Sequence, residues 1–163
     1  MFEIQLFGSL EVRTRGIRLA GTDFGGVRPR RLLALLALHD ELALADLAEL
    51  LEVPAAGVGT EVAVLRDHLE PGVRARDSVV AGHRGRYRLV PHRVRVDVRT
   101  FDELLQVAAA RPAERATKPL TAAAFLAARP LLVDEDAPWA VETRARYRAK
   151  LLMNCPAAVT GAF

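Results

Sequence analysis

The start of the sequence alternates between apolar and polar residues, and a period of two is typical of β-strands. Across residues 2–19 the apolar positions of this pattern are Ile4, Leu6, Leu10 and Val12. Glycine-containing pairs interrupt it at Gly8-Ser9 and Arg15-Gly16, where turns are expected. The pattern predicts two or three short strands in this part of the chain.

From Arg28 onward the apolar residues recur every three or four positions, which predicts helices. A first helix is expected over 28–39, with Pro29 near its start, and a second over 43–51. A third opens at Pro54 and is stopped by "EPG" at 70–72. Four apolar residues of the third helix share one narrow stripe and are expected in the core: Val58, Val62, Leu65 and Leu69.

A hairpin is expected over residues 78–90, with "AGHRGRYRLV" (81–90) as its turn and second strand. On a strand, Arg84, Arg86 and Arg88 would share one face, and Tyr87 and Leu89 the other. Residues 74–95 hold seven arginines against a single acid, Asp77. Such a charged face suits contact with a phosphate backbone, and it equally suits a solvated sheet surface.

Beyond Asp97 the pattern is helical throughout, with helices expected at 101–110, 120–128 and 138–152. The connections are expected at 111–119 and 129–137, and a loose tail at 154–163. Trp139 and Tyr147 lie on the last helix, and we expect them to dock the helical part onto its neighbour. Strands, three helices, a hairpin and then helices alone predict an α+β protein.

Composition narrows the class of protein. At 163 residues and 51% hydrophobic, the chain accommodates one domain, or a small domain with an appendage. The longest apolar run is far shorter than the roughly 20 residues of a membrane span, and no export signal is visible. Cys155 is the only cysteine, so no internal disulfide can form. These features favour a cytoplasmic protein with no membrane contact.

Candidate chemical sites are few. The four histidines are scattered and, with a single cysteine, lack the spacing of zinc ligands. "DED" (134–136) lacks the ligand spacing of a calcium loop and instead suits a helix N-terminus. No nucleophile stands beside a recognisable base. We therefore expect no metal, no cofactor and no enzyme activity.

Several stretches, taken in order, resemble one family. "FEIQLFGSLEV", "RPRRLLALLAL", "LRDHLEPG" and "GRYRLVPHRVRVDVRTFDELL" resemble the N-terminal part of antibiotic regulatory proteins of the SARP type. "PLLVDEDAPWAVETRARYRAKLL" (130–152) resembles the early helices of the bacterial transcriptional activator domain of that family. The resemblance covers residues 2–152.

The resemblance implies both a fold and a function. The fold would be an OmpR-like winged helix-turn-helix over 1–96, with an N-terminal β-sheet and a C-terminal wing hairpin. A short all-α appendage over 97–153 would follow, TPR-like but truncated. The chain would be a bacterial transcription regulator that binds double-stranded DNA, with RNA polymerase or another protein, or a second copy of itself, as further partners. Candidate DNA contacts are the wing residues Arg84, Arg86 and Arg88, then Arg66 and Thr60 on the third helix, and Arg28, Arg30 and Arg31 on the first long helix.

The third helix departs from the family's pattern. Its outward face carries Ala56, Thr60, Ala63, Val64 and Asp67, where family members tend to have Arg, Lys, His or Ser. A carboxylate pointed at phosphates is repulsive. An alternative function is therefore a winged helix that no longer reads DNA and binds a protein or peptide through Val64, Asp67 and Ala63. Both functions stay open from the sequence.

Overall fold

The computed structural model describes residues 1–156, which form two compact units. Unit 1 comprises Met1–Ile4 and Leu10–Arg95, and unit 2 comprises Gln5–Ser9 and the chain from Val96 onward. The described residues contain two sheets and six α-helices, so the predicted α+β class is confirmed. The sequence-based division at residue 96 stays a prediction.

The first sheet is formed by β1 (Phe2–Gln5), β2 (Glu11–Thr14), β3 (Ile17–Ala20) and β7 (Val94–Val96), in the order β3-β2-β1-β7. β2 and β3 are antiparallel. The turn between them falls at Arg15 and Gly16, whose φ angles are +49° and +76°, as the sequence predicted. The four apolar positions of the predicted alternation are all buried.

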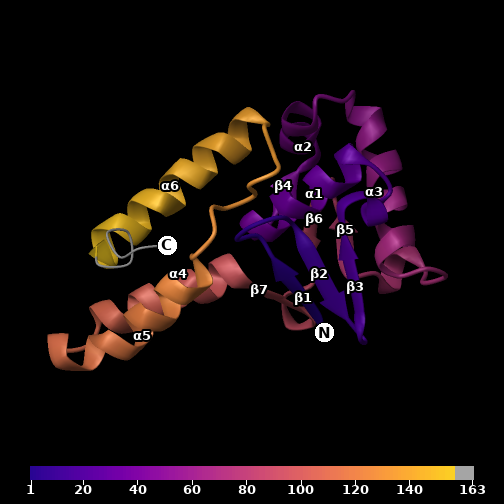
Figure 1. Ribbon diagram of the computed structural model, residues 1–163. Coiled ribbons are helices and arrows are strands. Elements are labelled where there is room, and N and C mark those ends of the chain that lie inside the picture. Colours follow the sequence, from indigo (N-terminus) through magenta and orange to yellow (C-terminus); the bar gives the residue numbers. More distant parts are fainter. Residues whose placement is uncertain (157–163) are drawn as a thin grey trace. The chain divides into compact units, whose positions relative to one another are not determined.

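Three helices follow in unit 1, close to their predicted bounds: α1 (Val27–Leu38), α2 (Leu44–Leu51) and α3 (Ala55–Leu69). Figure 1 shows them grouped together. The predicted stripe of α3 is buried at all four positions, Val58, Val62, Leu65 and Leu69. α1 buries every residue from Leu32 to Ala37, because its sequence is apolar on all sides there.

The second sheet has the order β4-β6-β5, with β4 (Leu42–Ala43), β5 (Val80–His83) and β6 (Arg86–Leu89). Both strand pairs are antiparallel. Short 3-10 segments flank the elements of unit 1: η1 (Gly21–Phe24), η2 (Ala75–Asp77) and η3 (Pro91–Arg93). Phe24 at the end of η1 is fully buried.

Unit 2 contains α4 (Asp97–Ala109), α5 (Ala113–Leu126) and α6 (Pro138–Asn154), coloured from pink to yellow in Figure 1. The prediction of a connection over 111–119 is wrong, because α5 begins at Ala113 and contains Pro119. A proline inside a helix removes one backbone hydrogen bond. Here Ala116, Pro119 and Ala123 share one buried stripe, so packing favours the helix despite that loss.

The segment Gln5–Ser9 is held to the helices of unit 2 by backbone contacts. The Asp97 carboxylate accepts hydrogen bonds from the backbone N–H groups of Leu6 and Phe7, at 2.9–3.0 Å. Phe7 and Gly8 also form β-bridges with Leu131. Burial raises the pKa of Asp97, and the bonds from the backbone oppose that shift. The sequence pattern had assigned this segment to the N-terminal sheet alone.

No helix within residues 1–156 has the length and apolar character needed to cross a membrane. The loose tail expected over 154–163 lies, from residue 157 on, outside the described residues. Before that, Cys155 is buried, and its thiol is 3.5 Å from the Leu120 carbonyl oxygen.

Candidate nucleic-acid interface

The predicted hairpin is present, and we call residues 78–90 the basic hairpin. Its two-residue turn consists of Arg84 and Gly85, with φ angles of +50° and +72°. A turn with two positive φ angles matches the right-handed twist of the flanking strands. Arg84 therefore lies at the turn and not on the strand, so the prediction that it shares a strand face with Arg86 and Arg88 is wrong.

The two faces of the basic hairpin differ as the alternation predicted. Arg86 and Arg88 stand opposite His83 and Ala81, and both arginines are exposed. On the other face Leu89 is buried and pairs with Val80. The Tyr87 ring covers Gly82, because a Cβ added at Gly82 would lie 2.8 Å from the ring. The face of β6 that carries Tyr87 and Leu89 is therefore the one that packs against the protein interior.

The arginines of the basic hairpin differ in their partners. Arg86 Nε lies 2.8 Å from Glu41 Oε2, with both side chains about half exposed. Exposed ion pairs of this kind contribute little to stability, but they reduce the charge offered to a ligand. Arg84 and Arg88 are exposed and form no ion pair among the described residues. These two guanidinium groups are the hairpin's most available cations.

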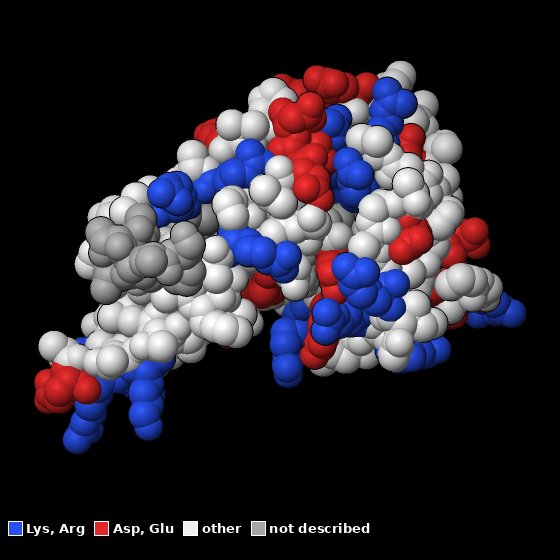
Figure 2. All heavy atoms as spheres, viewed as in Figure 1, with Lys and Arg blue, Asp and Glu red and all other residues white. Residues whose placement is uncertain are grey.

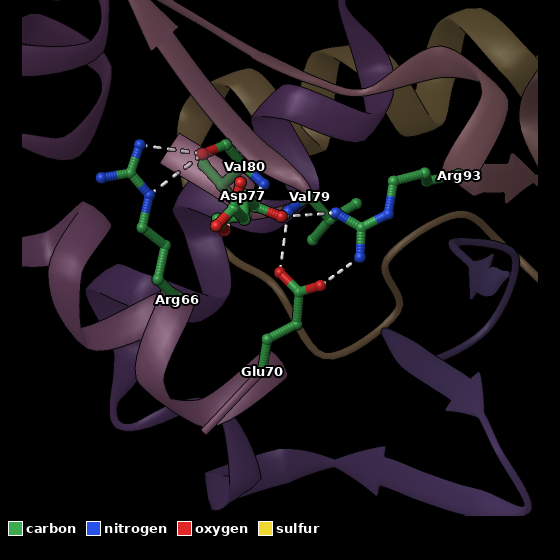
Figure 3. A network of polar contacts seen from close by, with 7 residues as sticks. Arg66, Glu70, Asp77, Val79, Val80 and Arg93 are labelled. Carbon is green, nitrogen blue, oxygen red and sulfur yellow. Dashed lines mark hydrogen bonds and ion pairs between the residues drawn. The ribbon is translucent and has the colours of Figure 1, made fainter. Parts of the chain in front are cut away.

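A network of polar contacts joins the basic hairpin to α3 (Figure 3). Arg66 Nε and Nη2 both donate to the Val80 carbonyl oxygen, at 3.0 and 2.8 Å. Glu70 Oε2 accepts from the Val79 N–H at 2.7 Å, and Glu70 Oε1 accepts from Arg93 Nη2. Arg93 Nη1 also donates to the Asp77 carbonyl oxygen at 2.9 Å. Sequence reasoning missed Glu70 and Arg93 because no local pattern links positions so far apart.

The predicted outward face of α3 carries no lysine or arginine. Thr60, Ala63 and Asp67 are exposed, as predicted. Val64 is not: it is half-buried against the loop before α1, since a Cβ added at Gly25 would lie 2.5 Å from Val64 Cγ1. The prediction that Val64 points outward is therefore wrong, because the Gly25-Gly26 loop covers that flank of the helix.

Charge is segregated along unit 1. Residues 40–70, which include α2 and α3, hold eight carboxylates and one arginine, Arg66. Residues 71–95, which include the basic hairpin, hold seven arginines and one carboxylate. Figure 2 shows acidic side chains gathered over the region where α2 lies. Residues 40–70 are thus acidic and residues 71–95 basic, and a phosphate backbone would be attracted only by the latter.

The arginines at the start of α1 lie beside a hollow of about 430 Å³. Arg28 is exposed, and Arg28 and Arg31 line the hollow. Glu52 and Glu61 line it as well. Arg30 is partly buried one turn into the helix. Carboxylates next to the guanidinium groups make this hollow electrostatically mixed, so its selectivity for phosphate is low.

Trp139 and Tyr147 both lie on α6. The Tyr147 ring is buried and packs edge-on against Phe7, with centroids 5.9 Å apart, and near Phe101 at 5.8 Å. Its hydroxyl donates to Asp102 at 2.7 Å, and burial together with this carboxylate raises the pKa of Tyr147. Trp139 is partly exposed, and its buried Nε1 has no partner among the described residues. A docking role for either side chain between domains stays a prediction.

Within residues 1–156, no three His, Cys, Asp or Glu side chains are grouped so that they could hold a metal ion. The "DED" acids end one residue before Ala137, the N-cap of α6, and the first turn of that helix contains no acidic residue.

No protein-family model matches the sequence, and no curated protein matches it. Among solved structures, the fold is similar to that of EmbR from Mycobacterium tuberculosis, a SARP-family regulator solved in complex with a low-affinity phosphopeptide. The TM-score is 0.74 and the sequence identity 24%, over 96% of this chain and 44% of the EmbR chain. The chain thus spans less than half of that protein. The likeness shows that the two chains share a fold over almost the whole of this sequence.

Proposed function

We propose that this chain is a DNA-binding regulator that holds duplex DNA by its phosphate backbone, mainly through the basic hairpin. The observation that carries the proposal is the segregation of charge within unit 1, with seven arginines over residues 71–95. Arg84 and Arg88 are exposed and available for phosphate oxygens. Each phosphate that they neutralise releases counterions, and this release favours binding.

In this function α3 contributes little to the recognition of DNA sequence. The predicted outward positions that are exposed are Thr60, Ala63 and Asp67, so the polar groups they offer are one hydroxyl and one carboxylate. In the major groove a carboxylate can accept hydrogen bonds only from the exocyclic amino groups of cytosine and adenine. We therefore expect affinity to depend strongly on salt and weakly on DNA sequence.

The basic hairpin is expected to account for much of the affinity for DNA. Replacing Arg84 and Arg88 together with alanine is expected to weaken binding to a random-sequence duplex. The negative slope of log K against log salt should become shallower by about 2, because each lost phosphate contact removes about 1 from its magnitude. Fluorescence anisotropy across a salt series measures both quantities.

Arg115 and Arg148 provide the matched control, because both are exposed and lie on helices of unit 2. Replacing that pair with alanine removes the same charge and should leave the slope unchanged. A hairpin variant with the wild-type slope would remove the hairpin from the proposal. A wild-type protein that does not bind the duplex at all would overturn the proposal itself.

A second candidate function is protein binding, and the acidic surface of α2 and α3 favours it. EmbR was solved with a phosphopeptide, but a phosphopeptide and this surface are both negatively charged and repel each other. A protein partner for the α2–α3 surface would instead be cationic. RNA polymerase or a second copy of the chain stay open as partners.

The second prediction separates the two functions. Replacing Ala63 and Asp67 with arginine adds charge to the exposed face of α3 and leaves the buried stripe intact. If a duplex lies on the hairpin, α3 is close to it, because Arg66 contacts β5. Affinity should then rise at least several-fold, and the salt slope should steepen by up to about 2. No gain in either quantity would mean that α3 never approaches DNA.

A further inference from the structure

Arg66 in α3 and Glu70, the residue that directly follows α3, bind the backbone at the beginning of β5. Arg66 donates twice to the Val80 carbonyl oxygen, at 3.0 and 2.8 Å. Glu70 accepts from the N–H of the preceding residue, Val79, at 2.7 Å. Figure 3 shows both side chains directed from the end of α3 toward Val79 and Val80. Two adjacent residues, Val79 just before β5 and Val80 at its start, are therefore bound from the C-terminal end of α3.

Glu70 also holds the chain at the other end of the basic hairpin. Its second oxygen accepts from Arg93, which lies in η3 directly after the hairpin. Arg93 in turn donates to the Asp77 carbonyl oxygen at 2.9 Å, and its guanidinium group lies 5.8 Å from the centre of the Phe2 ring. The Glu70 side chain is 8% exposed. This single carboxylate thus joins α3 to the segments that enter and leave the hairpin.

The environment of Glu70 differs from that of Asp67, which is exposed in the last turn of α3. The charge of Glu70 is compensated by Arg93 and by a backbone N–H, whereas Asp67 forms no ion pair among the described residues. Removing a carboxylate near a phosphate backbone should strengthen binding whenever that carboxylate acts only through its charge. A carboxylate that holds the hairpin in place should have the opposite effect.

We infer that Glu70 and Arg66 are positioning residues that set the basic hairpin beside α3, so that Arg84 and Arg88 present their charge together. The inference rests on the proposed function. Arg66 then contributes to DNA binding through the hairpin and not as a phosphate contact of its own.

The test compares two variants that each remove one negative charge from the C-terminal end of α3 or the residue that follows it, Asp67→Asn and Glu70→Gln. In Glu70→Gln the amide oxygen can accept a hydrogen bond from Val79 or from Arg93, but not from both. The amide NH2 group then faces the other donor, and that hydrogen bond is lost. We expect affinity for a random duplex to fall about tenfold, the order of one lost charge-assisted hydrogen bond. Asp67→Asn should raise affinity by up to a few-fold. Both are measured by anisotropy at a temperature where each variant is fully folded.

Amide hydrogen exchange, measured without DNA, supplies an independent readout. A positioning role predicts faster exchange in Glu70→Gln over residues 78–93, with α1 unchanged. If Glu70 only stabilises the fold, exchange should be faster throughout unit 1, and the folded fraction of the variant should bind DNA with wild-type affinity. That result would overturn the inference. Equal gains in affinity for both variants would also overturn it. If the wild type binds no DNA, the proposed function fails, and exchange still decides whether Glu70 positions the hairpin.

Arg66→Lys is the second variant, in case Glu70→Gln does not fold. Lysine keeps the charge and cannot reproduce the paired donors of a guanidinium group. Electrostatics alone therefore predicts unchanged affinity. The positioning role predicts weaker binding by several-fold, together with faster exchange over β5 and β6. Wild-type affinity combined with wild-type exchange in this variant would overturn the assignment of Arg66.

Discussion

Replacing Asp97 with alanine is expected to lower the free energy of unfolding of unit 2 by about 2–5 kcal/mol. The carboxylate accepts hydrogen bonds from the backbone N–H groups of Leu6 and Phe7. Both of those residues are buried, so truncation leaves two donors without an acceptor. Each unsatisfied buried group costs about 1–3 kcal/mol. Urea unfolding followed by the fluorescence of Trp139, the only tryptophan and a residue of unit 2, measures the loss.

Asp134→Ala is the matched control, because Asp134 is exposed and its removal changes the net charge equally. It should alter the unfolding free energy by no more than about 0.5 kcal/mol. Equal effects of the two substitutions would mean that the contacts between Asp97 and the backbone contribute nothing measurable.

Gly25→Ala is expected to destabilise unit 1 by about 2–4 kcal/mol. Gly25 has a φ angle of +93°, which is strained for any residue with a Cβ. The added Cβ would also lie 2.5 Å from Val64 Cγ1 and 2.7 Å from His68 Cε1, so α3 or the loop would have to shift. Positive-φ strain and overpacking each cost about 1–3 kcal/mol. Thermal unfolding followed by far-UV circular dichroism measures the change.

The same substitution at Gly59 should act in the opposite direction. Gly59 lies inside α3, and no atom approaches within 4 Å of a Cβ added there. Alanine is favoured over glycine in a helix interior by about 1 kcal/mol, so Gly59→Ala should raise stability by up to that amount. If Gly25→Ala proves as harmless as Gly59→Ala, the close contact between the loop and α3 is absent in solution.

The elements of unit 1 were predictable because each depends on a local period. The α3 stripe from Val58 to Leu69 and the Arg15-Gly16 turn follow from helical spacing and from glycine's tolerance of positive φ. The prediction for α5 failed because Pro119 reads as a helix breaker in a local window. Burial of the stripe that contains Pro119 outweighed that signal, and burial is a tertiary property.

The candidate site was predictable in part. Alternation along β6 correctly placed Arg86 and Arg88 on one exposed face. The partner of Glu70 was not predictable. Arg93 lies 23 residues further along the chain, and an ion pair produces no periodic pattern in the sequence. Val64 was misplaced for a related reason, since the loop that covers it comes from the segment before α1.

The hydrogen bonds between Asp97 and the Leu6 backbone can form only late in translation. The two residues are 91 positions apart, and Gly8 pairs with Pro130 still later in the chain. Translation therefore produces Gln5–Ser9 long before any of its partners in unit 2 exist. Closing so long a loop is entropically costly. Until it closes, Leu6 and Phe7, which are buried in the folded protein, remain exposed to solvent in the nascent chain. A stalled or truncated translation product that ends before α4 would expose this apolar segment to chaperones and to aggregation.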